Sequence, residues 1–177
     1  MSDASSATPP IPPTGGQPQG AQAQPQGPAL HTMAQYMKDF SFENPSPIES
    51  LSSPQNNSNI NVTVSVDAAH VRDNVHEVTL GIRVQATAAE KTLFLVEASY
   101  CGLFAMVAIP QENHDAILRI HCPSLLFPFL RQIVAEAVRN GGFPPLYLNM
   151  VDFAAIYQQQ QQAGGAGQAS GNVTVPS

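Results

Sequence analysis

The sequence predicts an α+β protein in which the strands precede the helices. From Tyr36 to Ile109, apolar and polar residues mostly alternate, which is the two-residue period of a strand with one buried face. From Glu112 to Arg139, and again from Phe153 to Tyr157, apolar residues recur every three or four positions, which is the period of an amphipathic helix; the proline-containing segment between them is expected to be extended. Because the two patterns occupy separate parts of the chain, an α+β fold is favoured over an alternating α/β fold.

The first strand is expected at 36–43, where Phe40 and Phe42 lie on one face and Asp39 and Glu43 lie on the other. The connection that follows, 44–59, is rich in Pro, Ser and Asn, and is expected to be long and irregular. A Greek-key order of strands requires a long return connection of this kind.

Three further strands are expected at 60–67, 77–86 and 92–109. The connections between them are short, which favours antiparallel neighbours. The last of the three is apolar on both sides, which indicates that both faces are covered over part of its length. Gly102 within it predicts a bulge or a bend.

The helices follow the strands. A first helical segment is expected at 112–121, and Pro123 then interrupts or redirects the chain. The main helix is expected at 124–139, with Asn140 and Gly141 as a left-handed C-terminal cap. A last helix is expected after Asp152, which is a suitable N-cap.

The main helix is broadly apolar. One face carries Leu126, Leu130, Ile133, Ala137 and Val138. Three more residues widen this stripe beyond what one sheet could cover: Leu125, Phe129 and Val134. The excess apolar surface favours a protein that binds or assembles.

The domain organisation follows from composition. Residues 1–33 and 158–177 are rich in Pro, Gln, Gly, Ala and Ser, and are expected to be disordered because they cannot bury enough apolar surface. Residues 34–157 are expected to form a single folded domain, which is large enough for a hydrophobic core.

Charge and residue types argue against several functions. The chain has 7 basic and 13 acidic residues and a net charge of −6, which argues against binding to nucleic acid or to an anionic membrane surface. No apolar run approaches the ~18 residues of a membrane-spanning helix, and the chain is expected to be cytoplasmic. The His and Cys spacings fit no metal site, so we expect no metal, no cofactor and no catalytic residues. Cys101 and Cys122 are expected to be buried free thiols.

Two surfaces are candidates for binding. Asp39, Glu43 and Glu97, with Leu95 beside them, form either a docking patch or an ordinary solvated sheet face. The second candidate is apolar surface near the long connection and the last helix, contributed by Ile48, Leu51, Phe153, Ile156 and Tyr157. These residues form either a groove for an extended apolar peptide or ordinary core or subunit interface.

Four motifs carry a resemblance to a known family. They are KDFSFENPSP (38–47), TLFLVEASYCGLF (92–104), CPSLLFPFLR (122–131) and RNGGFPPLYLNMVDF (139–153). Their order and spacing resemble SecB, the bacterial protein-export chaperone family, over about 36–157. The sequence departs from some relatives in having no Trp in the long connection and in its longer N-terminal extension.

The resemblance implies a four-stranded antiparallel Greek-key sheet with a long kinked helix and a C-terminal helix. It also implies a homotetramer, a dimer of dimers with the long helices between two sheet layers. Such a chaperone binds unfolded preproteins in apolar grooves without ATP, keeps them translocation-competent and delivers them to the SecA motor ATPase. A SecB-like chaperone that controls a toxin–antitoxin system is the alternative, and a small-molecule-binding protein is a more distant one.

The resemblance also assigns roles by position. The positions that match SecA-docking residues are Asp39, Glu43, Leu95 and Glu97. The expected client groove contains Ile48, Leu51, Phe153, Ile156 and Tyr157, and the last three match positions of the family's last helix. The expected subunit interface contains Leu126, Leu130, Ile133, Val134 and Ala137.

Overall fold

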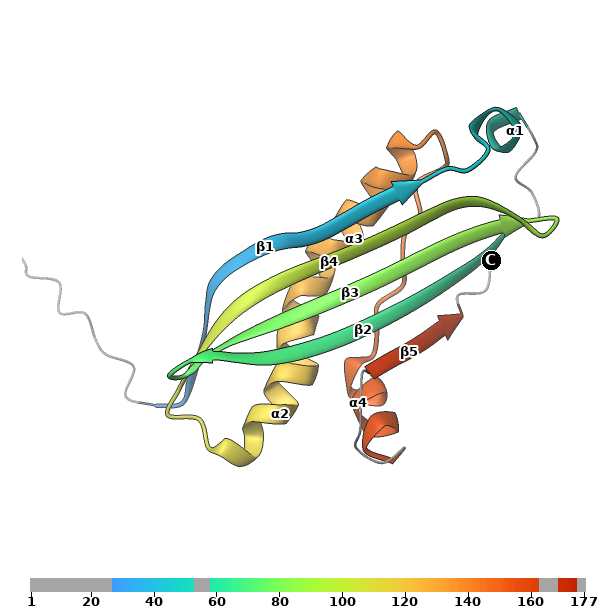
Figure 1. The fold of residues 1–177 in the computed structure, drawn as a ribbon. Helices are drawn as coiled ribbons and strands as arrows, with labels where there is room; N and C mark the ends of the chain where they lie inside the picture. The colour runs from blue at the N-terminus through green and yellow to red at the C-terminus, as the bar shows by residue number, and fades with distance from the viewer. Residues whose placement is uncertain (1–26, 53–57, 163–168, 175–177) are drawn as a thin grey trace, which may run out of the picture.

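A computed structural model describes residues 27–52, 58–162 and 169–174, and these form an antiparallel sheet with helices on one face (Figure 1). The strands are β1 (Ala29–Glu43), β2 (Asn59–Arg72), β3 (Val75–Ala88), β4 (Lys91–Val107) and β5 (Ala169–Thr174), in the spatial order β1-β4-β3-β2-β5. Strands β2, β3 and β4 follow one another through short turns, and β1 returns beside β4, which is the predicted four-stranded Greek-key order.

The two ends of the chain differ from the expectation for the tails. The structure begins β1 at Ala29, seven residues before the expected start at Tyr36, and pairs it with β4 along its length. It continues the last helix to Gln162 and adds β5 beside β2, two features that composition did not indicate. The rest of the predicted disordered tails, 1–26, 163–168 and 175–177, lies outside the described residues.

Strand β1 contains two irregularities in its pairing with β4. The register shifts between Thr32 and Ala34, and again between Met37 and Asp39, so Met33 and Lys38 are each an extra residue on β1. After the second bulge, Phe40 and Phe42 lie opposite Ala98 and Val96. The predicted alternation of 36–43 therefore holds from Asp39 onward.

One sheet face is apolar and covered by the helices, and the other is polar. Buried residues on the covered face include Val62, Val64, Val66, Val78, Leu80, Ile82 and Val84. Residues between them along the strands, such as Thr63, Thr79 and Arg83, lie on the open face. The alternation arises because successive side chains of a strand point to opposite faces.

Gly102 brings helix and sheet close together. It keeps its register opposite Gln35 and Val78, so the predicted bulge is not at this position. A Cβ atom there would lie 2.5 Å from Cε2 of Phe104 and 3.0 Å from Cδ2 of Leu126. Glycine is therefore needed for the packing of these two side chains.

The main helix is part of a longer helical run made of η1 (Gln111–Asn113), α2 (His114–Ala116), η2 (Ile117–His121) and α3 (Cys122–Asn140). The η2 segment is π-helical, and the N–H of Cys122 donates to the carbonyl of Ile117. Pro123 directly follows this wider turn and does not end the helix, so it redirects the chain rather than interrupting it (Figure 1).

The C-terminal end of α3 is a Schellman motif displaced by one residue from the prediction. Gly141 keeps right-handed helical angles, with φ of −72°, and Gly142 takes the left-handed conformation, with φ of 89°. The N–H groups of Gly142 and Phe143 donate to the carbonyls of Arg139 and Val138, at 3.1 and 3.2 Å. The prediction was wrong about which glycine is left-handed. Gly141 is instead required because a Cβ atom would overlap the ring of Phe42.

Two short helices complete the structure. Helix α1 (Pro47–Ser52) lies within the connection that was expected to be irregular. Helix α4 (Phe153–Gln162) begins directly after Asp152, the predicted N-cap, whose Oδ1 accepts a 3.0 Å hydrogen bond from the N–H of Ala155. The extended segment 143–152 joins α3 to α4.

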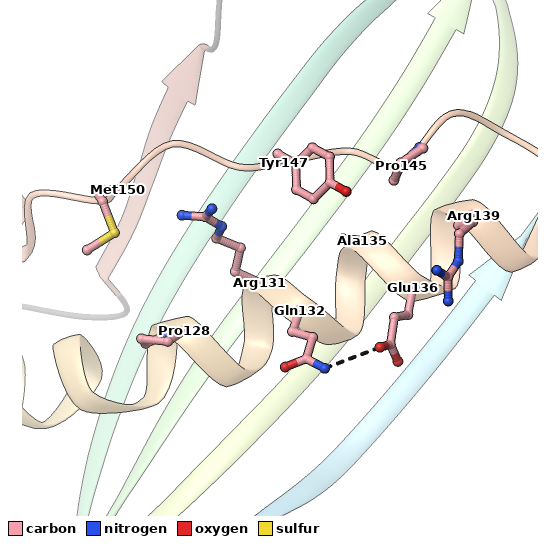
Figure 2. Close-up of a pocket in the computed structure, with 9 residues that line it drawn as sticks. All are labelled: Pro128, Arg131, Gln132, Ala135, Glu136, Arg139, Pro145, Tyr147 and Met150. Carbon is pink, nitrogen blue, oxygen red and sulfur yellow. Dashed lines mark hydrogen bonds between the residues drawn. The ribbon is translucent and has the colours of Figure 1, made fainter.

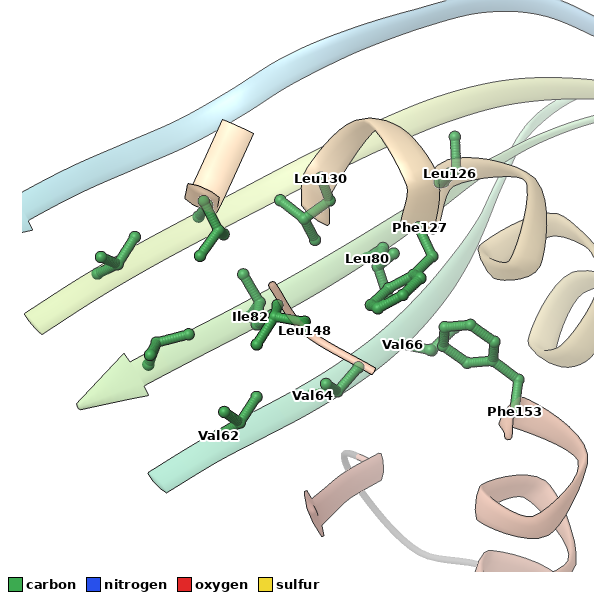
Figure 3. Packing of buried hydrophobic residues seen from close by; sticks show 14 of the residues in the cluster. Val62, Val64, Val66, Leu80, Ile82, Leu126, Phe127, Leu130, Leu148 and Phe153 are labelled. Carbon is green, nitrogen blue, oxygen red and sulfur yellow. The ribbon is translucent and has the colours of Figure 1, made fainter. Parts of the chain in front are cut away.

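The core lies between the covered sheet face and the helices. Leu126, Phe127 and Leu130 of α3 are fully buried above β3 and β4 (Figure 3). Leu148 and Phe153 close the core from the side of the 143–152 segment and α4 (Figure 3). Burial of each such side chain contributes ~1.5–3 kcal/mol, which makes this cluster the main source of stability.

Candidate functional site

The acidic patch is formed by Asp39, Glu43, Leu95 and Glu97 on the open face of the sheet. Strand pairing places Glu43 opposite Leu95, Ser41 opposite Glu97, and Asp39 opposite Ser99. Side chains directly opposite each other in an antiparallel pair point to the same face. The structure therefore brings the four predicted docking residues together on two neighbouring strands.

Nearby cations leave most of this negative charge uncompensated. Arg83 of β3 forms an ion pair with Glu97. Lys38 instead donates to Oε1 of Glu77 at 2.6 Å. Among the described residues, no cation pairs with Asp39 or Glu43. The outer part of the acidic patch therefore presents two free carboxylates.

A hydrogen-bonded cluster across three strands holds the bulge of β1 in place. The hydroxyl of Tyr36 donates to Oε2 of Glu77 at 2.6 Å, and Lys38 binds the other carboxylate oxygen. The hydrogen bonds from Lys38 and Tyr36 lower the pKa of Glu77, and the bond to Glu77 raises the pKa of Tyr36 to about 12. Cys101 lies beneath this cluster and is fully buried. The first residue of the acidic patch, Asp39, thus directly follows the β1 bulge that these hydrogen bonds hold in place.

Most of the predicted client-groove residues are not open to a client within one subunit. Phe153 and Ile156 belong to the core, with exposed fractions of 3% and 9%. The hydroxyl of Tyr157 donates to Oδ2 of Asp115 at 2.9 Å, which ties α4 to α2. In the free subunit the apolar side of α4 covers the subunit's own core, and the client-groove role of Phe153 and Ile156 stays a prediction.

The other two predicted groove residues lie in α1. Ile48 is 85% exposed, and α1 lies well apart from α4 (Figure 1). The side chain of Leu51 lies outside the described residues. The structure therefore does not join Ile48 with the α4 residues into one groove.

Two grooves flank α3 instead. The first, here called the linker groove, lies between α3 and the 143–152 segment and has a volume of about 450 Å³ (Figure 2). Its apolar lining comes from Pro128, Ala135, Pro145, Tyr147 and Met150. Tyr147 and Met150 are 69% and 72% exposed, so the groove presents apolar side chains to solvent. The sequence signal for it is the apolar segment stiffened by Pro144 and Pro145.

The second groove, here called the strand groove, lies between the end of β1 and the end of α3. It also has a volume of about 450 Å³, and Phe40, Phe42, Ile133 and Ala137 line it. The predicted interface residues Ile133 and Ala137 are thus partly exposed on the surface of the subunit.

The remaining predicted interface residues are core residues. Leu126, Leu130 and Val134 have no exposed surface, because they pack against the sheet of their own subunit. Within one subunit these three side chains are already covered, and their place in a subunit interface stays a prediction. The exposed apolar residues of α3 are Leu125 and Phe129, at 38% and 48%. The ring of Phe129 stacks on Tyr100, with centroids 6.1 Å apart.

Of the groups that could take part in chemistry, the two thiols are buried, whereas His70, His76 and His114 lie together, with the ring of His76 5.2 and 5.9 Å from the other two. Cys101 and Cys122 are buried free thiols, as predicted. Burial raises the pKa of Cys122 to about 12, which makes this thiol a poor nucleophile. Within 27–52, 58–162 and 169–174, no three His, Cys, Asp or Glu side chains could hold a metal ion. None of the described helices is long and apolar enough to cross a membrane.

An acidic open sheet face and apolar grooves around a long helix define an α+β binding protein. The chain belongs to the SecB family of protein-export chaperones, because the family model described as preprotein translocase subunit SecB matches residues 23–164. It is 48% identical over 141 residues to a protein-export protein SecB of Nitrobacter winogradskyi, covering 80% of this chain and 89% of that protein. A protein-export protein SecB of Methylocella silvestris is 45% identical over 146 residues, covering 82% of this chain and 91% of that protein.

A solved structure shares the fold. The SecB-like chaperone of Mycobacterium tuberculosis, in complex with a ChAD peptide from the HigA1 antitoxin, superposes with a TM-score of 0.54. The two chains are 13% identical, and the match covers 69% of this chain and 90% of the other. At this identity the likeness concerns the fold alone.

Proposed function

We propose that this protein binds unfolded preproteins in the cytoplasm, keeps them competent for translocation and delivers them to SecA. The observation that carries the proposal is the exposed apolar surface of the linker groove. Tyr147 and Met150 stand more than two thirds exposed beside α3. An exposed apolar groove in an export-chaperone family fits a partner with exposed apolar side chains, which is an unfolded chain.

The polar rim of the linker groove suits a polypeptide. Arg131 and Arg139 lie along the same side of α3 as Pro128 and Ala135 (Figure 2). Their guanidinium groups can donate hydrogen bonds to the carbonyls of an extended chain without reading its sequence. No catalysis is needed for this role, and we propose that the protein is not an enzyme.

Assembly is the second part of the proposal. Leu125, Phe129 and Ile133 give α3 an outward apolar surface next to Phe40 of the strand groove. We propose that this surface packs against other copies in a homotetramer, a dimer of dimers. Several client grooves would then lie on one particle.

Assembly also resolves the energetics of client binding. Each apolar side chain buried in a groove contributes ~1.5–3 kcal/mol, whereas micromolar to nanomolar affinity needs about 8–12 kcal/mol. Ordering the client consumes part of the gain, so one groove is marginal. A single client that occupies several grooves gains affinity through effective concentration.

The acidic patch is the proposed docking site for SecA. Asp39 and Glu43 have no ion-pair partner among the described residues, and Leu95 provides apolar area opposite Glu43 and next to Glu97 on β4. Free carboxylates beside a partly exposed apolar side chain suit a basic partner surface. The acidic patch and the linker groove lie on opposite faces of the sheet, so client and SecA can bind at the same time.

The proposal is tested by native mass measurement and titration with a denatured precursor. Tyr147→Ser with Met150→Ser should weaken client binding, while Val71→Ser, which removes a similarly exposed apolar residue from the far end of β2, should not. Asp39→Lys with Glu43→Lys should abolish SecA binding and leave client binding intact. Asp67→Lys, an exposed acid on the same sheet face but on β2, is the matched control. Equal binding of folded and denatured precursor would refute the proposal.

Control of a toxin–antitoxin system is the alternative function. The relatives with 45–48% identity are protein-export proteins, whereas the antitoxin-peptide complex shares only the fold at 13% identity. The export role is therefore the favoured proposal.

A further inference from the structure

Strand β5 covers part of the outer edge of β2. It pairs antiparallel with β2 over six positions, from Asn61 opposite Thr174 to Val66 opposite Ala169. In the described sheet, β2 has β3 on one side and only β5 on the other. Without β5, the backbone N–H and C=O groups along this stretch would form an open edge (Figure 1).

The strand that covers this edge has a poor sequence for a strand. Its residues are ASGNVT, with Gly171 and Asn172 at its centre. Glycine and asparagine are depleted in strands, and an interior glycine weakens strand pairing. By contrast, the β2 stretch that β5 pairs with contains Val62, Val64 and Val66, all buried. Strand β2 is therefore anchored in the core, whereas β5, which covers its edge, is expected to pair weakly.

The pairing of β5 with β2 is favoured because β5 is linked to helix α4 of the same domain. Helix α4 ends at Gln162, and β5 begins at Ala169, so a short connection links β5 to the body of the domain. A short tether gives the segment a high effective concentration at the edge. Such a cover blocks chance pairing with other chains, yet a longer segment with better strand residues can displace it.

We propose that the β2 edge from Asn61 to Val66 is a strand-addition site for an extended segment of client polypeptide, and that Ala169–Thr174 is its displaceable intramolecular cover. The inference rests on the proposed function, because the displacing strand is the unfolded client. Strand addition forms main-chain hydrogen bonds, which every polypeptide offers. It therefore suits a protein that must bind many unrelated sequences.

The test compares the full chain with a variant that ends at Gln162. If the cover is closed about 90% of the time, its removal raises the affinity for a denatured polypeptide about tenfold. Asn172→Pro in the full chain should act in the same direction, because proline cannot donate to the ladder. Gly171→Val with Asn172→Thr should strengthen the cover and weaken client binding.

Hydrogen exchange identifies the site. Backbone amides within Asn61–Val66 should lose protection in the shortened variant and regain it when a short Val- and Thr-rich peptide is added. The same peptide with N-methylated backbone groups should not restore protection, because it cannot form the ladder.

The possible outcomes separate the two proposals. If no variant binds denatured polypeptide, the chaperone function itself is refuted. If the full chain and the shortened variant bind it equally and client leaves the β2 amides unchanged, the strand-addition site is refuted and the chaperone function stands. If the shortened variant protects its own β2 edge and doubles its mass without client, the occupant is a second copy and the client assignment is overturned.

Discussion

Leu126→Ala distinguishes a core residue from an interface residue. Leu126 has no exposed surface in a single subunit and contacts the sheet at Gly102. The substitution removes three carbons, which costs about 2.4 kcal/mol in transfer free energy at ~0.8 kcal/mol for each. The cavity that remains adds to this, because the fixed backbone at Gly102 limits collapse. We expect a total loss of about 3–4 kcal/mol in the free energy of unfolding.

Phe129→Ala is the matched comparison. Phe129 lies one turn further along α3 and is 48% exposed, so its loss should cost the subunit only about 1 kcal/mol. Its main effect should be on assembly, seen as a lower native mass on dilution. Urea unfolding of both variants at two protein concentrations separates the cases, since only an interface residue gives a concentration-dependent change.

One result would refute the burial argument. If Leu126→Ala dissociates the assembly and leaves the stability of the isolated subunit unchanged, then Leu126 lies between subunits. Leu130 and Val134 would have to be reconsidered with it, because they are buried in the same layer.

Three further outcomes are expected. Gly102→Ala should destabilise the protein by about 1–3 kcal/mol in urea unfolding, because its Cβ would overlap the ring of Phe104; an unchanged midpoint would contradict this packing. Asp152→Ala should cost about 1 kcal/mol, and Asp152→Asn less, because asparagine retains the cap of α4. Lys38 and Tyr36 lower the pKa of Glu77, so its contribution is present above the ordinary carboxyl pKa and is lost as the pH falls through the lowered value. Glu77→Gln should therefore reduce stability at neutral pH and flatten its acid dependence, and a parallel pH profile would count against the cluster.

The acidic patch could be predicted from the sequence because a strand has a simple period. Asp39, Glu43 and Glu97 fall at odd positions of two strands, and alternation alone puts them on a face opposite the buried residues. The long connection between β1 and β2 indicated that β1 is not paired with β2, and a Greek-key order then places β1 antiparallel beside β4. The fold class followed from the same reasoning.

The apolar sites were harder to predict, because hydrophobicity marks burial without saying what covers a residue. Phe153 and Ile156 have the same pattern whether they face a client or their own sheet, and the structure assigns them to the core. Leu126 and Leu130 were expected between subunits for the same reason. Conversely, Tyr147 and Met150 lie in an extended segment that has no amphipathic period to reveal its exposed side.

Strand β5 could not be predicted, because nothing local favours it. Its residues 169–174 include Gly and Asn and follow a glutamine-rich helix end, a composition typical of a disordered tail. Its pairing depends on the unfilled edge of β2, which is a property of the folded sheet.

Because Lys38 is an extra residue in β1, the alternation of side chains between the two sheet faces is shifted by one position after it. Tyr36 and Asp39 lie on the same face although three positions apart, an odd spacing that a regular strand would place on opposite faces. The pairing from Asp39 to Glu43 with β4 therefore has its own phase, separate from that of 34–37. The orientation of the negatively charged surface is in this way fixed by the pairing from Asp39 onward and does not depend on the residues that precede the bulge.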